Sequence, residues 1–138
     1  MYFYSWERIS GKTLATAHKG EIKIFDIKNL KMPKEYISAH PSKLFSLDFS
    51  PVRENQLVSC TATTIKMWDL SSASCCQPVH TIQVNREYDS VWKVRYTPFG
   101  EGLVSLLYPS TIRREPNNLL LWSTSSSSKN KGPGNNIF

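Results

Sequence analysis

Short runs of alternating hydrophobic and polar residues follow one another along most of this chain. The runs are rich in β-branched and aromatic residues, and Pro, Gly, Asn and Ser separate them, which predicts β-strands. We expect strands over residues 3–8, 13–17, 21–27, 35–38, 44–49, 56–61, 64–70, 79–84, 91–96, 103–107 and 118–123. No stretch of a dozen residues carries hydrophobic positions at helical spacing, so the pattern predicts an all-β chain.

The strand pattern repeats along the chain. Residues 13–26 align without a gap with residues 56–69, at an offset of 43 positions. The two segments share a hydroxyl position (Thr16, Ser59), and each ends in an aromatic residue followed by Asp. A third and looser copy covers residues 91–122. The same order of hydrophobic, hydroxyl and aromatic positions in three copies indicates a repeat architecture.

A period of about 40–45 residues, with four strands per unit and a Trp-Asp ending, is typical of WD40 blades. The pattern therefore predicts an all-β, WD40-type β-propeller fragment with blades at about residues 1–38, 39–84 and 85–122. A Ser/Asn/Gly-rich tail over 123–138 is expected to be disordered. An immunoglobulin-like sandwich is the alternative fold, but that fold does not explain the 43-residue repeat period.

Three blades do not close a ring, because propellers need about four to eight. We therefore expect a piece of a larger propeller. Alone, such a piece would expose two blade faces, which is a hazard for association or aggregation.

The second copy carries a candidate hydrogen-bond network. Trp68 can anchor a strand hydroxyl, Ser59, and a histidine from the preceding loop, His40. An Asp is expected in the following turn, but Ala62 stands there. A catalytic base is the alternative role for His40, and the structural role is the better interpretation because Ser59 and Trp68 accompany it.

An insertion over residues 108–118 of the third copy is the best candidate partner-binding loop, because long loops on rigid scaffolds often carry function. Arg113, Arg114 and Glu115 lie in it, and the two arginines can pair with an acidic partner surface. A solvated loop without a partner is the alternative.

Catalytic and metal signals are weak. Adjacent Cys75 and Cys76, with His80, do not match the spacing of a zinc site. Asp26 and Asp69 occupy matching repeat positions, so they indicate turn residues rather than an acid/base pair. No nucleophile elbow, phosphate-binding loop or zinc-protease motif occurs. We expect no enzyme activity, no cofactor and no metal.

The net charge of +6 makes nucleic-acid binding an alternative function. Lys93 and Arg95 alternate with hydrophobic residues on one strand, so both charges should lie on one side. The basic residues are otherwise dispersed, which disfavours this alternative. The cysteine count favours a reducing compartment, and the sequence shows neither a signal peptide nor a membrane-spanning run. We expect a cytoplasmic protein that meets membranes only through partners.

The third copy, from Val91-Trp-Lys-Val-Arg-Tyr through Ile112-Arg-Arg-Glu115 to Leu119-Leu-Leu-Trp122, resembles the family of WD repeat-containing protein 59. The resemblance covers about residues 4–122. It implies a propeller subunit of the GATOR assembly, called SEA in yeast, which relays amino-acid sufficiency to the TOR kinase at the lysosome or vacuole. The implied partners are other subunits of that complex. A generic WD40 adaptor piece is the alternative.

Overall fold

The structure is a computed structural model that describes residues 3–72, 76–84, 89–99, 102–109 and 118–123. All its regular elements are β-strands, and their bounds follow. They are β1 (Phe3–Trp6), β2 (Thr13–His18), β3 (Glu21–Asp26), β4 (Glu35–Ser38), β5 (Ser46–Phe49), β6 (Gln56–Cys60), β7 (Thr64–Asp69), β8 (His80–Gln83), β9 (Asp89–Tyr96), β10 (Gly102–Pro109) and β11 (Asn118–Ser123). Each expected strand is present, with ends that differ by a few residues.

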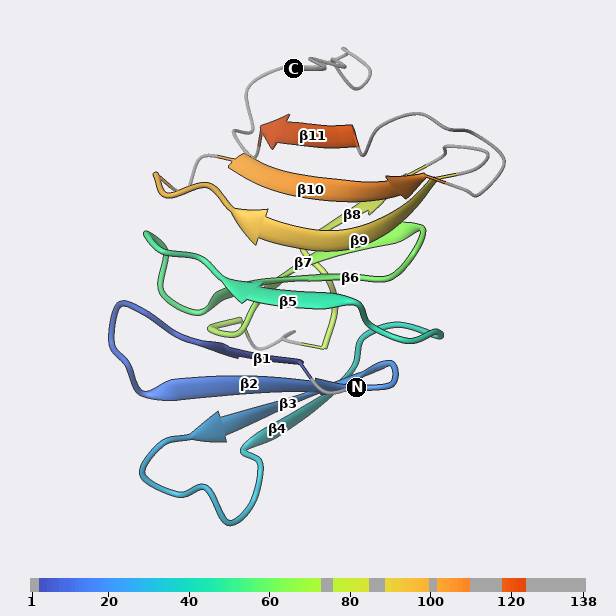
Figure 1. The fold of residues 1–138 in the computed structure, drawn as a ribbon. Helices are drawn as coiled ribbons and strands as arrows, with labels where there is room; N and C mark the ends of the chain where they lie inside the picture. Colours follow the sequence, from blue (N-terminus) through green and yellow to red (C-terminus); the bar gives the residue numbers. More distant parts are fainter. Residues whose placement is uncertain (1–2, 73–75, 85–88, 100–101, 110–117, 124–138) are drawn as a thin grey trace.

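The strands form three antiparallel sheets. Sheet 1 has the order β1-β2-β3-β4, sheet 2 has β5-β6-β7-β8, and sheet 3 has β9-β10-β11. Neighbours in each sheet are also neighbours in sequence, as in a β-meander. Figure 1 shows the sheets stacked face to face, with β1, β5 and β9 following one another along the same side of the stack.

The register of the strand pairs repeats from sheet to sheet. Leu14 lies opposite Phe25, Leu57 opposite Trp68, and Leu103 opposite Trp122. The three sheets are therefore structural copies of one unit. They form part of a β-propeller and not a closed ring, as the repeat predicted.

Two hydrophobic cores hold the stack together. The first joins sheets 1 and 2 and includes Ile22, Phe49 and Trp68. The second joins sheets 2 and 3 and includes Ile65 and Leu103. Sheet 2 is covered on both faces, which explains why β5 and most of β6 are continuously buried instead of alternating.

One strand departs from the expected alternation. The register between β9 and β10 shifts, because Leu106 lies opposite Lys93 whereas Leu107 lies opposite Val91. Trp92 is thus the extra residue of a β-bulge, and bulges re-aim side chains. Alternation along the strand predicts that Trp92 shares a side with Val94, but Val94 is buried and Trp92 is 52% exposed.

The turn between β1 and β2 is closed by a buried carboxylate. Glu7 accepts hydrogen bonds from the backbone N–H groups of Ile9, Ser10 and Gly11. Burial alone would raise the pKa of Glu7, but the hydrogen bonds from Ser10, Ile9 and Gly11 outweigh it and lower that pKa.

Candidate functional site

The structure brings His40, Ser59 and Trp68 together in the interior. The indole Nε1 of Trp68 donates to Ser59 Oγ at 2.9 Å, and His40 Nε2 lies 2.9 Å from the same oxygen. The imidazole and indole rings meet edge to face, with centroids 6.5 Å apart. All three side chains are buried, so the arrangement links the loop before β5 to strands β6 and β7.

The surroundings of His40 favour its neutral form. Burial, with a smaller contribution from the nearby charge of Lys66, lowers the pKa of His40 to about 4. Lys66 Nζ donates to the carbonyl oxygen of Ala39 at 2.8 Å, and it lies 5.8 Å from the centroid of the Trp68 ring. A neutral, buried imidazole without access to solvent is poorly placed to act as a general base on a substrate.

The other ring nitrogen of His40 marks where the network ends. Its Nδ1 is buried and has no hydrogen-bond partner among the described residues. The position expected to hold an Asp is Ala62, which has no side-chain acceptor. The second copy therefore holds three members of the expected network.

Part of the network recurs in sheet 3 and is absent from sheet 1. Trp122 Nε1 donates to Ser105 Oγ at 2.9 Å, as Trp68 does to Ser59. In sheet 1 the corresponding aromatic residue is Phe25, which has no donor. The recurrence at equivalent positions is the mark of a repeat-packing feature rather than of a single active site.

A second group of aromatic residues lies on the surface. Phe45 stacks on Trp92, with centroids 6.0 Å apart and an interplanar angle of 18°. Trp92 in turn meets Tyr108, with centroids 5.8 Å apart and an angle of 37°. Phe45 is half-buried, and Trp92 and Tyr108 are 52% and 55% exposed. We call these three residues the aromatic surface.

The aromatic surface joins two sheets at one end of the stack. Phe45 directly precedes β5 of sheet 2, whereas Trp92 and Tyr108 belong to β9 and β10 of sheet 3. In Figure 1 this is the end at which β10 finishes. Sequence reasoning placed Tyr108 at the start of the insertion but missed Phe45 and Trp92, because the bulge that turns Trp92 outward has no local sequence signal.

The candidate loop residues Arg113, Arg114 and Glu115 lie outside the described residues. The insertion connects the end of β10 with the start of β11. Because Tyr108 stands one residue before the end of β10, the aromatic surface adjoins the root of the insertion.

A buried carboxylate connects all three sheets. Asp48 Oδ1 in β5 accepts from Arg8 Nη2 at 3.1 Å and from Arg95 Nη1 at 2.8 Å. Its Oδ2 accepts from the backbone N–H of Tyr96 at 3.0 Å. The Asp48 side chain is 1% exposed, whereas the two arginines are about half exposed. We call this group the Asp48 clamp, and sequence reasoning missed it because its members lie far apart along the chain.

The described residues that the sequence suggested as catalytic or metal-binding candidates do not come together in one site. Asp26 and Asp69 accept from backbone N–H groups two residues onward, as turn residues do. Cys76 and His80 are exposed, and Cys75 lies outside the described residues. In the part of the chain that the structure describes, no three His, Cys, Asp or Glu side chains gather as a metal site would require. Burial raises the pKa of the Cys60 thiol to about 12, which leaves it unreactive.

The two basic residues of β9 do not form a patch of free positive charge of the kind that binds nucleic acid. Lys93 and Arg95 are both on the exposed side, as expected, but Arg95 is paired with Asp48. No helix among the described residues is long and apolar enough to cross a membrane.

Comparison with solved structures shows the fold. A chain from the crystal structure of the mitotic checkpoint complex matches with a TM-score of 0.67 and 21% identity, over 88% of this chain and 35% of that one. At that identity the likeness extends to the fold alone. No family profile matches the chain.

Comparison with curated proteins shows closer relatives. The chain is 38% identical to the GATOR2 complex protein Wdr59 of Drosophila melanogaster over 121 residues, and 37% identical to the human GATOR2 complex protein WDR59 over 118 residues. It is 30% identical to maintenance of telomere capping protein 5 of Saccharomyces cerevisiae over 98 residues. The matches to the fly and human proteins cover 87% and 86% of this chain but 12% of each relative. As a partial propeller that spans a small share of its relatives' length, the chain belongs to the WDR59 family.

Proposed function

We propose that this chain is a non-enzymatic protein-interaction scaffold within a GATOR2-like complex, and that it binds other subunits of that complex. The observation that carries the proposal is the aromatic surface. Exposed Trp and Tyr on rigid strands, next to a long insertion, are the residue types that dominate protein-protein binding energy. The names of the fly and human relatives support the complex.

We also propose the finer role that the family resemblance implies. A subunit of this kind would relay amino-acid sufficiency to TOR kinase signalling, and it would reach the lysosomal or vacuolar membrane through its partner subunits. The blades proposed for this role are residues 1–38, 39–84 and 85–122, with 123–138 as a Ser/Asn/Gly-rich tail. Arg113 and Arg114 would add charge to the aromatic surface from the neighbouring insertion.

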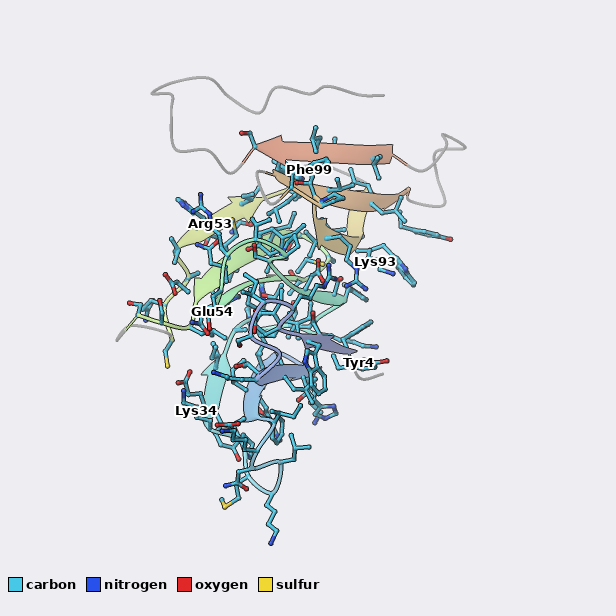
Figure 2. The ribbon with its side chains drawn as sticks, turned by 90° about the vertical axis from the view of Figure 1, so that its left-hand side faces the viewer. Tyr4, Lys34, Arg53, Glu54, Lys93 and Phe99 are labelled. Carbon is cyan, nitrogen blue, oxygen red and sulfur yellow. The ribbon has the colours of Figure 1, made fainter. Side chains whose placement is uncertain are left out.

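The test is recovery of partner subunits by the tagged chain. Replacing Trp92 by Ala, or Tyr108 by Ala, should weaken binding about tenfold or more, because each removes an anchoring ring. A matched control is Phe99→Ala. Phe99 is 83% exposed and follows the opposite end of β9, and Figure 2 labels it. Unchanged recovery of the Trp92 and Tyr108 variants would contradict the proposal.

A charge test addresses the insertion. Arg113→Glu together with Arg114→Glu should reduce recovery of the same partners without changing far-UV circular dichroism. The same preparation separates the alternative functions. Binding of DNA or RNA with a steep dependence on salt would favour a nucleic-acid-binding propeller piece instead.

A further inference from the structure

The connection between β3 and β4 combines basic and hydrophobic side chains. Residues 27–34 read Ile-Lys-Asn-Leu-Lys-Met-Pro-Lys, with three lysines and no acidic residue. Leu30 is 52% exposed and Met32 is 70% exposed, and the three lysines are exposed as well. We call residues 27–34 the basic loop.

Backbone hydrogen bonds hold both ends of the basic loop. The N–H of Ile27 donates to the carbonyl oxygen of Lys12 at 2.9 Å, and the N–H of Lys34 donates to the carbonyl oxygen of Ile24 at 2.7 Å. In Figure 1 the loop extends from the stack beyond the ends of β3 and β4. A loop that is already held in place loses little conformational entropy when its tip binds a surface.

The equivalent connection of sheet 2 shows that a loop at this position stays exposed when both neighbouring sheets are present. The N–H of Val79 donates to the carbonyl oxygen of Met67, as that of Lys34 donates to Ile24, so Val79 and Lys34 are equivalent. Sheet 2 is packed on both faces, yet Val79 is 55% exposed. The exposure of the basic loop therefore does not require an uncovered sheet.

The basic loop belongs to one end of the stack. The connections β1–β2, β5–β6, β7–β8 and β9–β10 lie at the same end, because successive strands run antiparallel. Figure 2 views the molecule from this end, and Phe99, Arg53 and Lys34 follow one another from sheet 3 to sheet 1. All the large hydrophobic side chains that are exposed in the described connections lie at this end, and they are Ile9, Leu30, Met32, Val52, Val79 and Phe99.

Positive charge accompanies these hydrophobic side chains. Arg8 pairs with Asp48, and Lys34 Nζ lies 3.9 Å from Glu35 Oε1. The acidic residues of the described connections at this end are Glu7, which is buried, and Glu54. The basic residues there outnumber them, and they are Arg8, Lys12, Lys28, Lys31, Lys34 and Arg53.

The residue types of the basic loop fit a lipid surface better than a protein or a nucleic acid. Lysine is depleted at protein interfaces, and leucine is under-represented among the residues that dominate their binding energy. Single-stranded nucleic acid is held by aromatic stacking, and the loop has no aromatic residue. Aliphatic side chains flanked by lysines match the boundary of an anionic bilayer, where the aliphatic groups enter the acyl region and the ammonium groups meet the headgroups.

We propose that the basic loop docks this end of the molecule on an anionic lipid surface. Leu30 and Met32 insert between the headgroups, and Lys28 and Lys31, on either side of Leu30, lie against them. The contact goes beyond the proposed function, because binding to partner subunits requires no lipid.

The experiment measures binding of the complete chain to lipid vesicles by cosedimentation. Vesicles of phosphatidylcholine with about 30% phosphatidylserine should bind the chain, and vesicles of phosphatidylcholine alone should bind it at least about tenfold more weakly. Binding to the anionic vesicles should fall as salt is raised, because salt screens the lysines.

Charge reversal tests the lysines. Lys28→Glu together with Lys31→Glu should weaken binding to the anionic vesicles at least about 25-fold, since each lysine near such a surface contributes about fivefold in affinity. The matched control is Lys19→Glu together with Lys43→Glu, which changes the net charge equally. Both lysines are exposed in connections at the opposite end, so this variant should change binding by less than about threefold.

Leu30→Ser together with Met32→Ser tests insertion. This variant should bind the anionic vesicles about tenfold more weakly, with unchanged far-UV circular dichroism. The proposal is overturned by a wild-type chain that does not bind anionic vesicles, by equal losses in the two lysine variants, or by unaltered binding of the Leu30 and Met32 variant. Reduced recovery of partner subunits by these variants, without vesicle binding, would make this end a protein interface instead.

Discussion

At the scale of single residues, Ser59 is the point where the indole of Trp68 and the imidazole of His40 converge. Its Oγ accepts from Trp68 and shares a second hydrogen bond with His40, and all of these groups are buried. Removing the hydroxyl leaves the indole N–H buried without an acceptor. Ser59→Ala should therefore lower the unfolding free energy by about 1–3 kcal/mol, measured by urea titration.

Ser71→Ala is the matched control for that measurement, because Ser71 is exposed and its hydroxyl donates to Asp69, a turn residue. This variant should change the unfolding free energy by less than about 0.5 kcal/mol. Equal effects of the two substitutions would remove the reason to assign the network a role in stability.

His40 makes the stability depend on pH. Its pKa is about 6.5 in the unfolded chain and about 4 in the fold, so the folded state disfavours protonation. The stabilisation is fully present above about pH 6.5 and is lost as the pH falls toward about 4. We expect the unfolding free energy to fall by up to about 3 kcal/mol over this window.

The matching variant is His40→Gln, which should flatten the dependence of the unfolding free energy on pH. Glu7 adds a further loss of stability at lower pH. Its pKa is lowered in the fold, so its stabilisation is present above about pH 4.5 and is lost as the carboxylate becomes protonated. A profile that stays steep between pH 6.5 and 4 in His40→Gln would contradict the assignment.

At the scale of elements, the Asp48 clamp couples β5 to Arg8 after β1 and to β9. Asp48→Ala removes the acceptor of the Tyr96 N–H and leaves both arginines without their partner. We expect the unfolding free energy to fall by about 2–4 kcal/mol. This is less than for a fully buried ion pair, because the two arginines are half exposed and solvent screens them.

Asp48→Asn separates the backbone hydrogen bond from the ion pairs. The amide oxygen can still accept from the Tyr96 N–H, whereas the negative charge that pairs with the arginines is gone. This variant should lose less, about 1–2 kcal/mol, and its stability should respond less to salt than that of the wild type. An Asn variant as unstable as the Ala variant would show that charge, rather than the backbone hydrogen bond, dominates the clamp.

Gly20 sets how closely the turn between β2 and β3 approaches the loop before β5. Its carbonyl accepts from the N–H groups of Ala39 and His40, both at 3.0 Å. A Cβ added at Gly20 would lie 2.0 Å from the carbonyl oxygen of His40. Gly20→Ala should therefore force the loop apart and cost about 3 kcal/mol or more in thermal or urea unfolding.

Gly11→Ala provides the comparison. Gly11 has a φ of 67°, so alanine there is strained, but the nearest atom to an added Cβ is 3.9 Å away. The expected cost is about 1–2 kcal/mol, from backbone strain alone. If Gly11→Ala proved the more damaging change, the close approach at Gly20 would not be the limiting contact.

At the scale of the whole molecule, sheet 2 links the unfolding of the other two sheets. One hydrophobic core lies between sheets 1 and 2, and the other lies between sheets 2 and 3. We therefore expect far-UV circular dichroism and tryptophan fluorescence to report one coincident unfolding transition. Two separate transitions would show that the sheets unfold independently.

Local patterns are sufficient to predict most of the architecture. Strands of period two and hairpins between sequence neighbours are short-range features, so the amino-acid sequence alone predicts the strands and the three-copy repeat. The pairing of Ser59 with Trp68 is predictable for the same reason, since both belong to adjacent strands of one hairpin. The role of His40 follows from the repeat and the resemblance to WD40 blades.

Tertiary structure decided the features that join one sheet to another. The register shift at Trp92 depends on how β9 pairs with β10 and packs on sheet 2, so alternation along β9 predicted the wrong side for that ring. Asp48 meets arginines 40 and 47 positions away. Such contacts depend on the stacking of whole sheets, and no short window of sequence encodes the distance between two sheets. The aromatic surface and the Asp48 clamp both arise at that level.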